Sequence, residues 1–353
     1  MKFGVSLKPH MINDAHLTYF RQLGCQSIIA WVPLPAGNGM WSTEDLNRLR
    51  EIVNKHGLEL AGIEGIHPAH WDHIVLDEPG KDIQMQNVLS TIRNMGQAGI
   101  PCLSYNFSII GVWGYYSERD NRDGRGGARV KKFDIDRVPT ATLPGNREFW
   151  FNSIQAPQLF AQSLSRRSAE GNLPPVDEQA LWERIEYFLS HALPVAEEAG
   201  VKLAAHPDDP PAPVLRQIAR LLVSVKNLKR LIEIVPSPYN CIAFCQGTIS
   251  TMEDAEILED IRYFAERDKI AMVHFRNVRG RYPRWQEVFI DEGDTDMLEA
   301  MKIYRNSGYS GTIIPDHTPY MDLPGELWWE VGMAYALGYM QAARQALDPH
   351  SRM

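Results

Sequence analysis

Eight short apolar segments recur along this chain of 353 residues, and segments with helical periodicity separate most of them. Each apolar segment has the length of a β-strand, and such runs are typical of strands covered on both faces of a parallel sheet. Strands that alternate with helices eight times along one chain predict a (β/α)8 barrel. The expected strands are 2–7, 27–32, 59–65, 102–107, 202–207, 241–245, 270–275 and 311–316.

The segments between the expected strands carry the start and stop signals of amphipathic helices. Residues 43–56 begin with Thr43 and an acidic first turn, and they place apolar side chains on one face. No internal sequence repeat is visible, so the regular spacing carries the prediction. We expect an α/β protein with a single TIM-barrel domain over residues 1–353. Further helices are predicted at 83–98, 177–199, 296–307 and 326–346.

One long insertion interrupts this alternation. Residues 108–176 lie between the fourth strand and its helix, and they are rich in arginine and aromatic side chains. Connections of this length in a compact domain are usually functional or disordered. We expect a lid or a subunit-contact element at 108–119 and 145–165. The glycine-rich part at 120–131 is more typical of a mobile surface loop.

Four potential metal ligands stand at or just after the ends of the last four expected strands: His206, Cys245, His274 and Asp316. They are too far apart in the sequence for a local zinc-finger motif. The carboxyl ends of the strands in a βα-barrel meet at one face, where active sites lie. Two imidazoles, a thiolate and a carboxylate form a ligand set for zinc, iron, cobalt or manganese. Singly, each residue also has a structural explanation, but the repeated placement predicts a shared metal site.

Several polar residues near these ligands are candidates for supporting roles. Asp208 or Asp209 could orient the imidazole of His206. Arg276 could bind a substrate carboxylate, or it could form a salt bridge with an acid in a neighbouring loop. His317 follows the last ligand directly and is placed to act as a general acid or base.

Composition excludes several other classes of protein. The net charge of −8 argues against a nucleic-acid-binding surface, which needs clustered Lys and Arg. The N-terminal sequence lacks the apolar region of a signal peptide, and no apolar run approaches the roughly 20 residues that cross a bilayer. Four cysteines in a chain of this length do not form a disulfide framework. We therefore expect a cytoplasmic protein that binds neither nucleic acid nor membrane.

Taken together, these segments resemble the mannonate dehydratase family of metal-dependent TIM barrels. The resemblance implies that His206, Cys245, His274 and Asp316 bind Mn²⁺ or Fe²⁺ and that His317 is catalytic. It also implies that enzymes of this kind convert D-mannonate to 2-keto-3-deoxygluconate. The matching motifs are TIRN-GQAGI–YNF (91–107), HPDDPP (206–211), CQGT (245–248), VHFRN (273–277), DM (296–297) and GY-G-IIPDH (308–317).

The same resemblance implies a substrate pocket, and here the chain departs from the family pattern. The positions that match the family's pocket include Asn106 and Arg276, and we add Asn277, Trp113 and Asp208 as expected substrate contacts.

A family tyrosine expected after a Pro-Gly is replaced by Glu326, so Tyr320 is our candidate for its catalytic role. A family arginine after YNF is missing, unless Arg119 or Arg122 replaces it.

Four functions remain open. The first is a metal-dependent dehydratase that acts on D-mannonate or a related sugar acid and gives a 2-keto-3-deoxy product. The second is a metal-dependent isomerase or epimerase of the xylose-isomerase-like group, which needs no acid for a leaving hydroxyl. The others are a non-catalytic descendant that binds a sugar acid and a zinc hydrolase. We expect the protein to form a homo-oligomer, namely a dimer.

Overall fold

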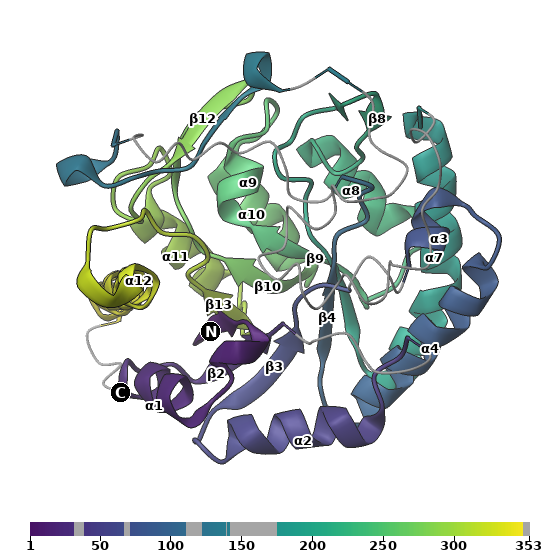
Figure 1. Ribbon diagram of the computed structural model, residues 1–353, viewed down its shortest axis with the longest axis horizontal. Helices are drawn as coiled ribbons and strands as arrows, with labels where there is room; N and C mark the ends of the chain where they lie inside the picture. The colour runs from purple at the N-terminus through teal and green to yellow at the C-terminus, as the bar shows by residue number, and fades with distance from the viewer. Residues whose placement is uncertain (32–38, 67–70, 111–121, 139, 142–174, 349–353) are drawn as a thin grey trace.

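Eight parallel strands close into a barrel in the computed structural model of the chain (Figure 1). The structure describes residues 1–31, 39–66, 71–110, 122–138, 140–141 and 175–348. Each barrel strand pairs with the barrel strands that precede and follow it in the chain, and β1 pairs with β13 to close the sheet. The barrel strands are β1 (Lys2–Leu7), β2 (Ser27–Ala30), β3 (Glu59–Ile63), β4 (Cys102–Tyr105), β6 (Lys202–Ala205), β9 (Asn240–Cys245), β10 (Ile270–His274) and β13 (Thr312–Ile314).

All eight predicted strands are therefore present, and the predicted TIM barrel is confirmed. Several of them end earlier than their apolar runs. For example, β2 ends at Ala30 and β4 ends at Tyr105. The residues that follow, such as Trp31 and Asn106, are only partly buried, and they leave the strand ladder to form the barrel mouth. An apolar run in the sequence does not show where the last hydrogen bond between strands forms, so the predicted strand ends differ from the observed ones.

Helices surround the barrel, and each predicted helix is present (Figure 1). Several have side-chain caps, as at Asp177, which accepts from the amide of Ala180, and at Asp296, which accepts from the amide of Glu299. The cap before residue 43 is Ser42, one residue earlier than expected. The helices are α1 (Asp14–Gln22), α2 (Thr43–Asn54), α3 (Asp72–Leu76), α4 (Lys81–Gln97), α7 (Glu178–Ala199), α8 (Val225–Ile234), α9 (Gln246–Ser250), α10 (Ile257–Glu266), α11 (Met297–Asn306) and α12 (Trp328–Leu347).

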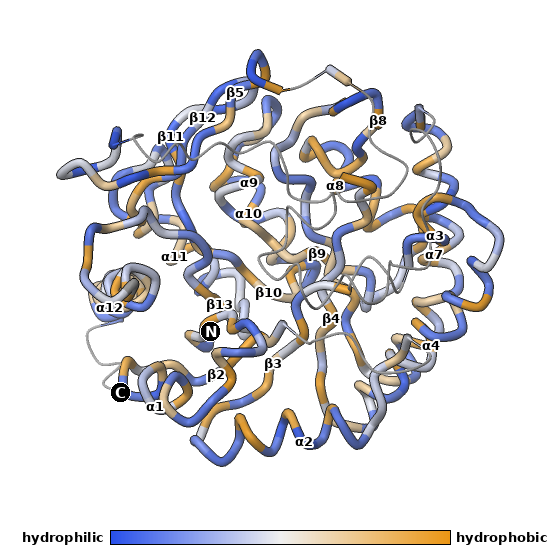
Figure 2. The backbone as a smooth tube through the Cα atoms, in the orientation of Figure 1, coloured by the Kyte–Doolittle hydropathy of each residue, from blue (hydrophilic) through white to orange (hydrophobic). Residues whose placement is uncertain are grey.

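The buried apolar residues form two clusters. The larger one fills the space between the strands and the ring of helices. Figure 2 shows the result as hydrophobic strands and helices that alternate between hydrophilic and hydrophobic positions. The smaller cluster fills the barrel interior with mostly small side chains, such as Ala61, Ala204 and Ala243. The helices of the described part are all too short or too polar to cross a bilayer.

Two small antiparallel sheets sit on the loops at the barrel mouth. One is the hairpin of β7 (Val214–Leu215) and β8 (Ile218–Ala219). The other has three strands: β11 (Val278–Arg281), β12 (Arg284–Glu287) and β5 (Lys132–Asp134). Because β5 belongs to the long insertion and β11 and β12 follow β10, this sheet joins the insertion to the loop that follows His274.

The glycine-rich part of the insertion makes contacts with the barrel loops along residues 122–131, and its mobility stays a prediction. Arg125 binds Asp291 at 2.7 Å, and the backbones of Arg129 and Tyr320 exchange hydrogen bonds of 3.0 and 2.8 Å. Backbone pairing of this kind continues into β5 and offsets the conformational entropy of the glycines. Most of 108–119 and all of 145–165 lie outside the described residues, so the lid or subunit-contact role stays a prediction.

Candidate metal centre and active site

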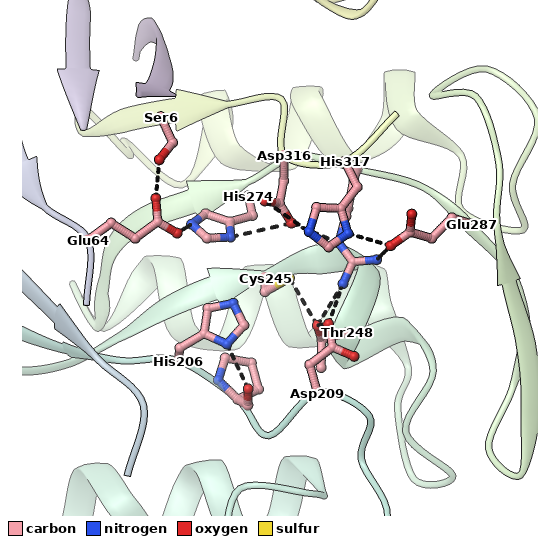
Figure 3. Close-up of polar contacts among 12 residues, drawn as sticks. Ser6, Glu64, His206, Asp209, Cys245, Thr248, His274, Glu287, Asp316 and His317 are labelled. Carbon is pink, nitrogen blue, oxygen red and sulfur yellow. Dashed lines mark hydrogen bonds and ion pairs between the residues drawn. The ribbon is translucent and has the colours of Figure 1, made fainter. Parts of the chain in front are cut away.

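Three of the four predicted metal ligands meet at the carboxyl end of the barrel. Cys245 and His274 are the last residues of β9 and β10 and lie side by side in register, and His206 follows β6 directly. One ligand atom from each of these three residues lies within 4.8 Å of the others. Asp316 is outside this trio, but its Oδ2 lies 3.6 Å from Nδ1 of His274 (Figure 3).

The two imidazoles of the trio have different hydrogen-bonding partners. Nδ1 of His206 lies 2.7 Å from the backbone oxygen of Pro207, so it carries a proton and donates. The expectation that Asp208 or Asp209 orients this ring is therefore wrong. Asp208 instead accepts from the amide of Leu222 and pairs with a buried arginine. His274 is buried, and its Nε2 and Nδ1 lie 3.3 Å from Glu64 and 3.6 Å from Asp316.

The charges around the trio favour a thiolate at Cys245. Burial by itself raises the pKa of this thiol, but Arg276 and the two imidazoles outweigh it and hold the pKa well below its ordinary value. Burial also opposes protonation of His274, yet Asp316 and Glu64 raise its pKa well above the usual range. A buried thiolate and two imidazoles whose ligand atoms lie within 4.8 Å of one another are a donor set for a divalent transition ion. The residues present thus fit the predicted metal.

Arg276 lies at the centre of a buried ionic network. Its guanidinium is 2.7 Å from Asp209, 3.0 Å from Asp316 and 3.5 Å from Glu287. Of the two roles that the sequence left open for Arg276, these contacts favour the internal salt bridge. A Cβ at Gly247 would lie 2.7 Å from the Arg276 side chain, so only glycine leaves room for it.

Thr248 links this network to the thiolate. Its hydroxyl lies 3.0 Å from Sγ of Cys245 and 3.0 Å from Asp209, and it accepts from Arg276 at 2.9 Å. The short α9 that begins after Cys245 therefore supplies both the space for the guanidinium and a hydroxyl beside the sulfur. The CQGT motif has a direct structural reason in these contacts.

His317 lies next to the metal centre and forms a carboxylate–imidazole pair. Its Nδ1 hydrogen-bonds to Oε1 of Glu287, the last residue of β12, and its Nε2 lies 3.7 Å from Asp316 (Figure 3). Burial opposes ionisation of Glu287, but His317 and Lys131 lower the pKa of this carboxyl to about 2. Glu287 is thus an anion that fixes Nδ1 of His317 as the proton-bearing nitrogen.

The other predicted site residues have varied surroundings. Tyr320 packs its ring on Trp328, with ring centroids 3.9 Å apart, and the Arg129 guanidinium lies 5.5 Å from its ring centroid. Asn106 follows β4, and its buried Oδ1 has no hydrogen-bond partner among the described residues. Asn277 uses its amide on the backbone of residues 290 and 295, which leaves it a structural role in that loop.

Of the two arginines considered as replacements for the family's arginine, the structure describes Arg122. Arg122 binds Asp322 at 2.6 Å on the exposed rim. Arg119 and Trp113 lie outside the described residues.

Three residues of the site were missed in the sequence. Glu64 follows β3, and its Oε1 lies 3.3 Å from Nε2 of His274. Its signal was available, because this apolar run also closes on an acidic residue. Glu287 and Lys131 gave no such signal, since they meet only where the insertion pairs with β12. The amide of Glu287 donates to the carbonyl of Lys131 at 2.9 Å.

Lys131 faces the site. Because Gln286 is opposite Lys132 in the ladder, Lys131 is opposite Glu287, and opposite residues project from the same face of a sheet. Burial lowers the pKa of this ammonium, but the negative charges of Glu287 and Asp316 outweigh it, with Tyr320 also contributing, so the pKa is raised overall. An ammonium ion therefore stands close enough to Glu287 and Asp316 for their charges to raise its pKa.

A separate cavity of about 380 Å³ lies at the opposite, amino-terminal end of the barrel. Its rim carries Lys2, which pairs with Glu59, and Lys202, which pairs with Asp268. It contains none of the residues described above. The candidate site residues lie instead at the carboxyl end of the strands, where active sites of βα-barrels lie.

Comparisons with known proteins agree with this geometry. The sequence model of the family D-mannonate dehydratase (UxuA) matches residues 10–353. The chain is 31% identical to Mannonate dehydratase 2 of Halalkalibacterium halodurans over 313 residues, which cover 86% of this chain and 87% of that protein. It is also 31% identical to the mannonate dehydratase of Thermotoga petrophila over 351 residues, which cover 92% and 93% of the two chains.

Solved structures show the same fold. The mannonate dehydratase from Streptococcus suis serotype2 superposes with a TM-score of 0.78 at 24% identity, covering 98% of this chain and 95% of that one. An L-ribulose 3-epimerase superposes with a TM-score of 0.59 at 16% identity, covering 99% and 98%. At these identities the two structures support the barrel fold and no further property.

Proposed function

Because this chain belongs to the D-mannonate dehydratase family, we propose that it removes water from D-mannonate or a closely related sugar acid at the site formed by His206, Cys245 and His274. Membership makes it a hydro-lyase, a carbon–oxygen lyase that leaves a 2-keto-3-deoxy sugar acid. The observation that carries the site assignment is the buried trio, whose ligand atoms lie within 4.8 Å of one another. The epimerase-like neighbours share only the fold and favour no second function.

We propose that His206, Cys245, His274 and Asp316 hold one Mn²⁺ or Fe²⁺ ion. Cys245 is the residue with the strongest support, because its thiol is held ionised by surrounding cations. When bound, such an ion supplies positive charge that makes the hydrogen on the carbon next to the substrate carboxylate easier to remove.

His317 provides one of the two proton transfers that dehydration needs. Since Glu287 holds the proton on Nδ1, Nε2 of His317 is the atom that accepts or donates a proton. The side chain is 28% exposed, so the ring edge can reach a substrate in the mouth. Tyr320, on the loop that follows β13, is our candidate for the second transfer.

Lys131 is our candidate for binding the substrate carboxylate, because it supplies a cation at the mouth whose pKa is raised by Glu287 and Asp316. The buried Oδ1 of Asn106 is an acceptor for a substrate hydroxyl. The expected substrate contact of Trp113 stays a proposal, since that residue lies outside the described part.

Assembly and compartment complete the proposal. Leu327, Val331 and Tyr335 follow one another at intervals of four residues on α12 and its start, and each is at least 40% exposed. An exposed apolar stripe of this kind supports a homodimer. The four cysteines are all buried and free, which supports a reducing, cytoplasmic compartment.

The test of the proposed function is a substrate panel. Mn²⁺-loaded protein is incubated with a set of aldonic acids, and the 2-keto-3-deoxy product is assayed. We expect product from D-mannonate or from one of its epimers, and His317→Asn should abolish it while keeping the metal. If no member of the panel gives product, the proposed function is wrong. If His317→Asn turns over normally, only the role of His317 is wrong.

A further inference from the structure

Glu64 is a buried carboxylate beside the trio that no role described above uses. It follows β3, its side chain is 10% exposed, and its amide donates to the carbonyl of Ala30 at 2.9 Å. Oε2 of Glu64 accepts a hydrogen bond from the hydroxyl of Ser6, which belongs to β1. That hydroxyl in turn accepts from the indole N–H of Trp31 at 3.1 Å.

The order of donors in this chain is fixed by chemistry. An indole N–H can only donate, so Ser6 accepts there and gives its own single proton to Glu64. The backbone of Gly65 lies close to the indole, since a Cβ there would be 3.2 Å from the ring and the φ of Gly65 is 85°. Trp31, Ser6 and Glu64 therefore form a directed relay that ends in an anion with one oxygen left.

The remaining oxygen of Glu64 points toward the metal centre. Oε1 lies 3.3 Å from Nε2 of His274, and Figure 3 shows the carboxylate on the side of the ring opposite Asp316. On that opposite side, Nδ1 of His274 is 3.6 Å from Asp316. The ring thus lies between two carboxylates, and each of them faces a different nitrogen.

We propose that Glu64 is a positioning residue that holds the proton of His274 on Nε2 and so presents Nδ1 to the metal. This inference rests on the proposed metal centre and adds to it a specific ligand atom. Carboxylates commonly fix the orientation and tautomer of metal-bound imidazoles in this way. His206 has the opposite arrangement, because its Nδ1–H donates to the carbonyl of Pro207 and its Nε2 is the nitrogen that can face the metal. The two histidines therefore offer the metal different nitrogens.

A direct role of Glu64 in proton transfer fits the contacts less well. One of its oxygens is engaged by Ser6 and the other faces His274, so neither is directed at a substrate. With its side chain 10% exposed, Glu64 also lies deeper than His317, whose side chain is 28% exposed. Its effect on the reaction then passes through the metal ligand.

The experiment compares metal affinity in Glu64→Gln, Ser6→Ala and a control. Glu59→Gln removes an acid from the other end of the same strand, where it pairs with Lys2. Mn²⁺ binding is measured by calorimetry, and the melting temperature of the metal-free proteins reports on folding. We expect Glu64→Gln to weaken Mn²⁺ about 10- to 100-fold, in line with the loss of other carboxylates that support metal ligands. Ser6→Ala should have a smaller effect, and Glu59→Gln should have none.

Histidine tautomers give a readout that a purely structural role would not change. In Zn²⁺-loaded protein with ¹⁵N-labelled histidine, the spectrum should show His274 bound through Nδ1 in the wild type and a loss of that signature in Glu64→Gln. Wild-type affinity in Glu64→Gln, or binding of His274 through Nε2, would overturn the proposal. A ligand count that falls by one in X-ray absorption would make Glu64 a direct ligand and would also overturn it. If the wild type binds no Mn²⁺, the proposed function fails instead.

Discussion

Replacing Arg276 with glutamine separates a structural guanidinium from one that binds substrate. Arg276 and Asp209 are each only 2% exposed and lie 2.7 Å apart, and Asp316 and Glu287 lie within 3.5 Å of the same guanidinium. The substitution removes the cation and leaves these carboxylates behind in a poorly solvated site. Breaking a buried ion pair from one side typically costs about 3–5 kcal/mol.

We therefore expect Arg276→Gln to lower the free energy of unfolding of the metal-free protein by about 3–5 kcal/mol at pH 8. The assay is urea unfolding followed by circular dichroism, with EDTA present so that metal binding does not contribute. Arg122→Gln is the matched control, because the Arg122–Asp322 pair is more than half exposed at the rim. Exposed pairs contribute about 0–1 kcal/mol, so the control should remain close to the wild type.

The pH dependence of the loss gives a second check. Burial raises the pKa of Asp316, but His317, His274 and Arg276 hold it well below its ordinary value. Such a carboxyl stabilises the fold above its unfolded pKa, and that contribution is lost as the pH falls through the folded pKa. Without Arg276 the folded pKa rises, so the variant can take up protons at pH 4–5 and relieve its repulsion. The loss of stability should then be smaller at pH 4–5 than at pH 8. An unfolding free energy equal to that of the wild type, together with a raised KM, would show that Arg276 serves the substrate instead.

Three further substitutions test other parts of the site and the fold. Lys131→Met should raise KM for the sugar acid at least tenfold and leave Mn²⁺ affinity within a few-fold of the wild type, measured by steady-state kinetics and calorimetry; unchanged KM would exclude it as the carboxylate contact. Cys245→Ser should weaken Mn²⁺ binding by more than tenfold in the same titration, because a neutral hydroxyl replaces a thiolate, and equal affinity would remove Cys245 from the ligand set. Burial raises the pKa of Asp260 to about 6, so the wild type should lose stability as the pH rises through 6. In urea unfolding, Asp260→Asn should be as stable as the wild type at pH 4. At pH 8 the variant should be more stable, by at most about 3 kcal/mol.

The sequence predicted the barrel because two independent patterns pointed to the same structure. Apolar runs marked strands buried on both faces, and capped amphipathic segments marked the helices between them. His206, Cys245 and His274 were found in the same way, since a polar ligand that closes an apolar run must lie at the mouth once the sheet closes. The same rule applies to Glu64, which ends the third apolar run and lies 3.3 Å from His274.

The parts that sequence could not supply depend on loops that meet only in three dimensions. Glu287 is an ordinary acidic residue in a polar stretch, and its importance comes from the contact with His317. Lys131 reaches the site because β5 pairs with β12. A strand of three residues is too short for its sequence pattern to predict this pairing. Asp208, two residues after His206, suggested an orienting carboxylate, yet it accepts from the amide of Leu222, and the acceptor for the imidazole is the carbonyl of Pro207.

This division between strands and loops also accounts for how the chain departs from its family. The residues that match the family's metal ligands lie on or just after β6, β9, β10 and β13, where the ladder of the barrel fixes the backbone and tolerates little change. The missing tyrosine and arginine belong to loops, which tolerate change more readily. In this chain Lys131 comes from the insertion, next to β5, in the sheet that also contains Glu287 at the end of β12. If Lys131 binds the substrate carboxylate as proposed, it takes the place of an arginine in the loop after β4 without moving any ligand. On this argument the metal chemistry and the substrate preference are set by separate parts of the fold, so Lys131→Met should alter the preference among aldonic acids while Cys245→Ser should reduce turnover of all of them alike.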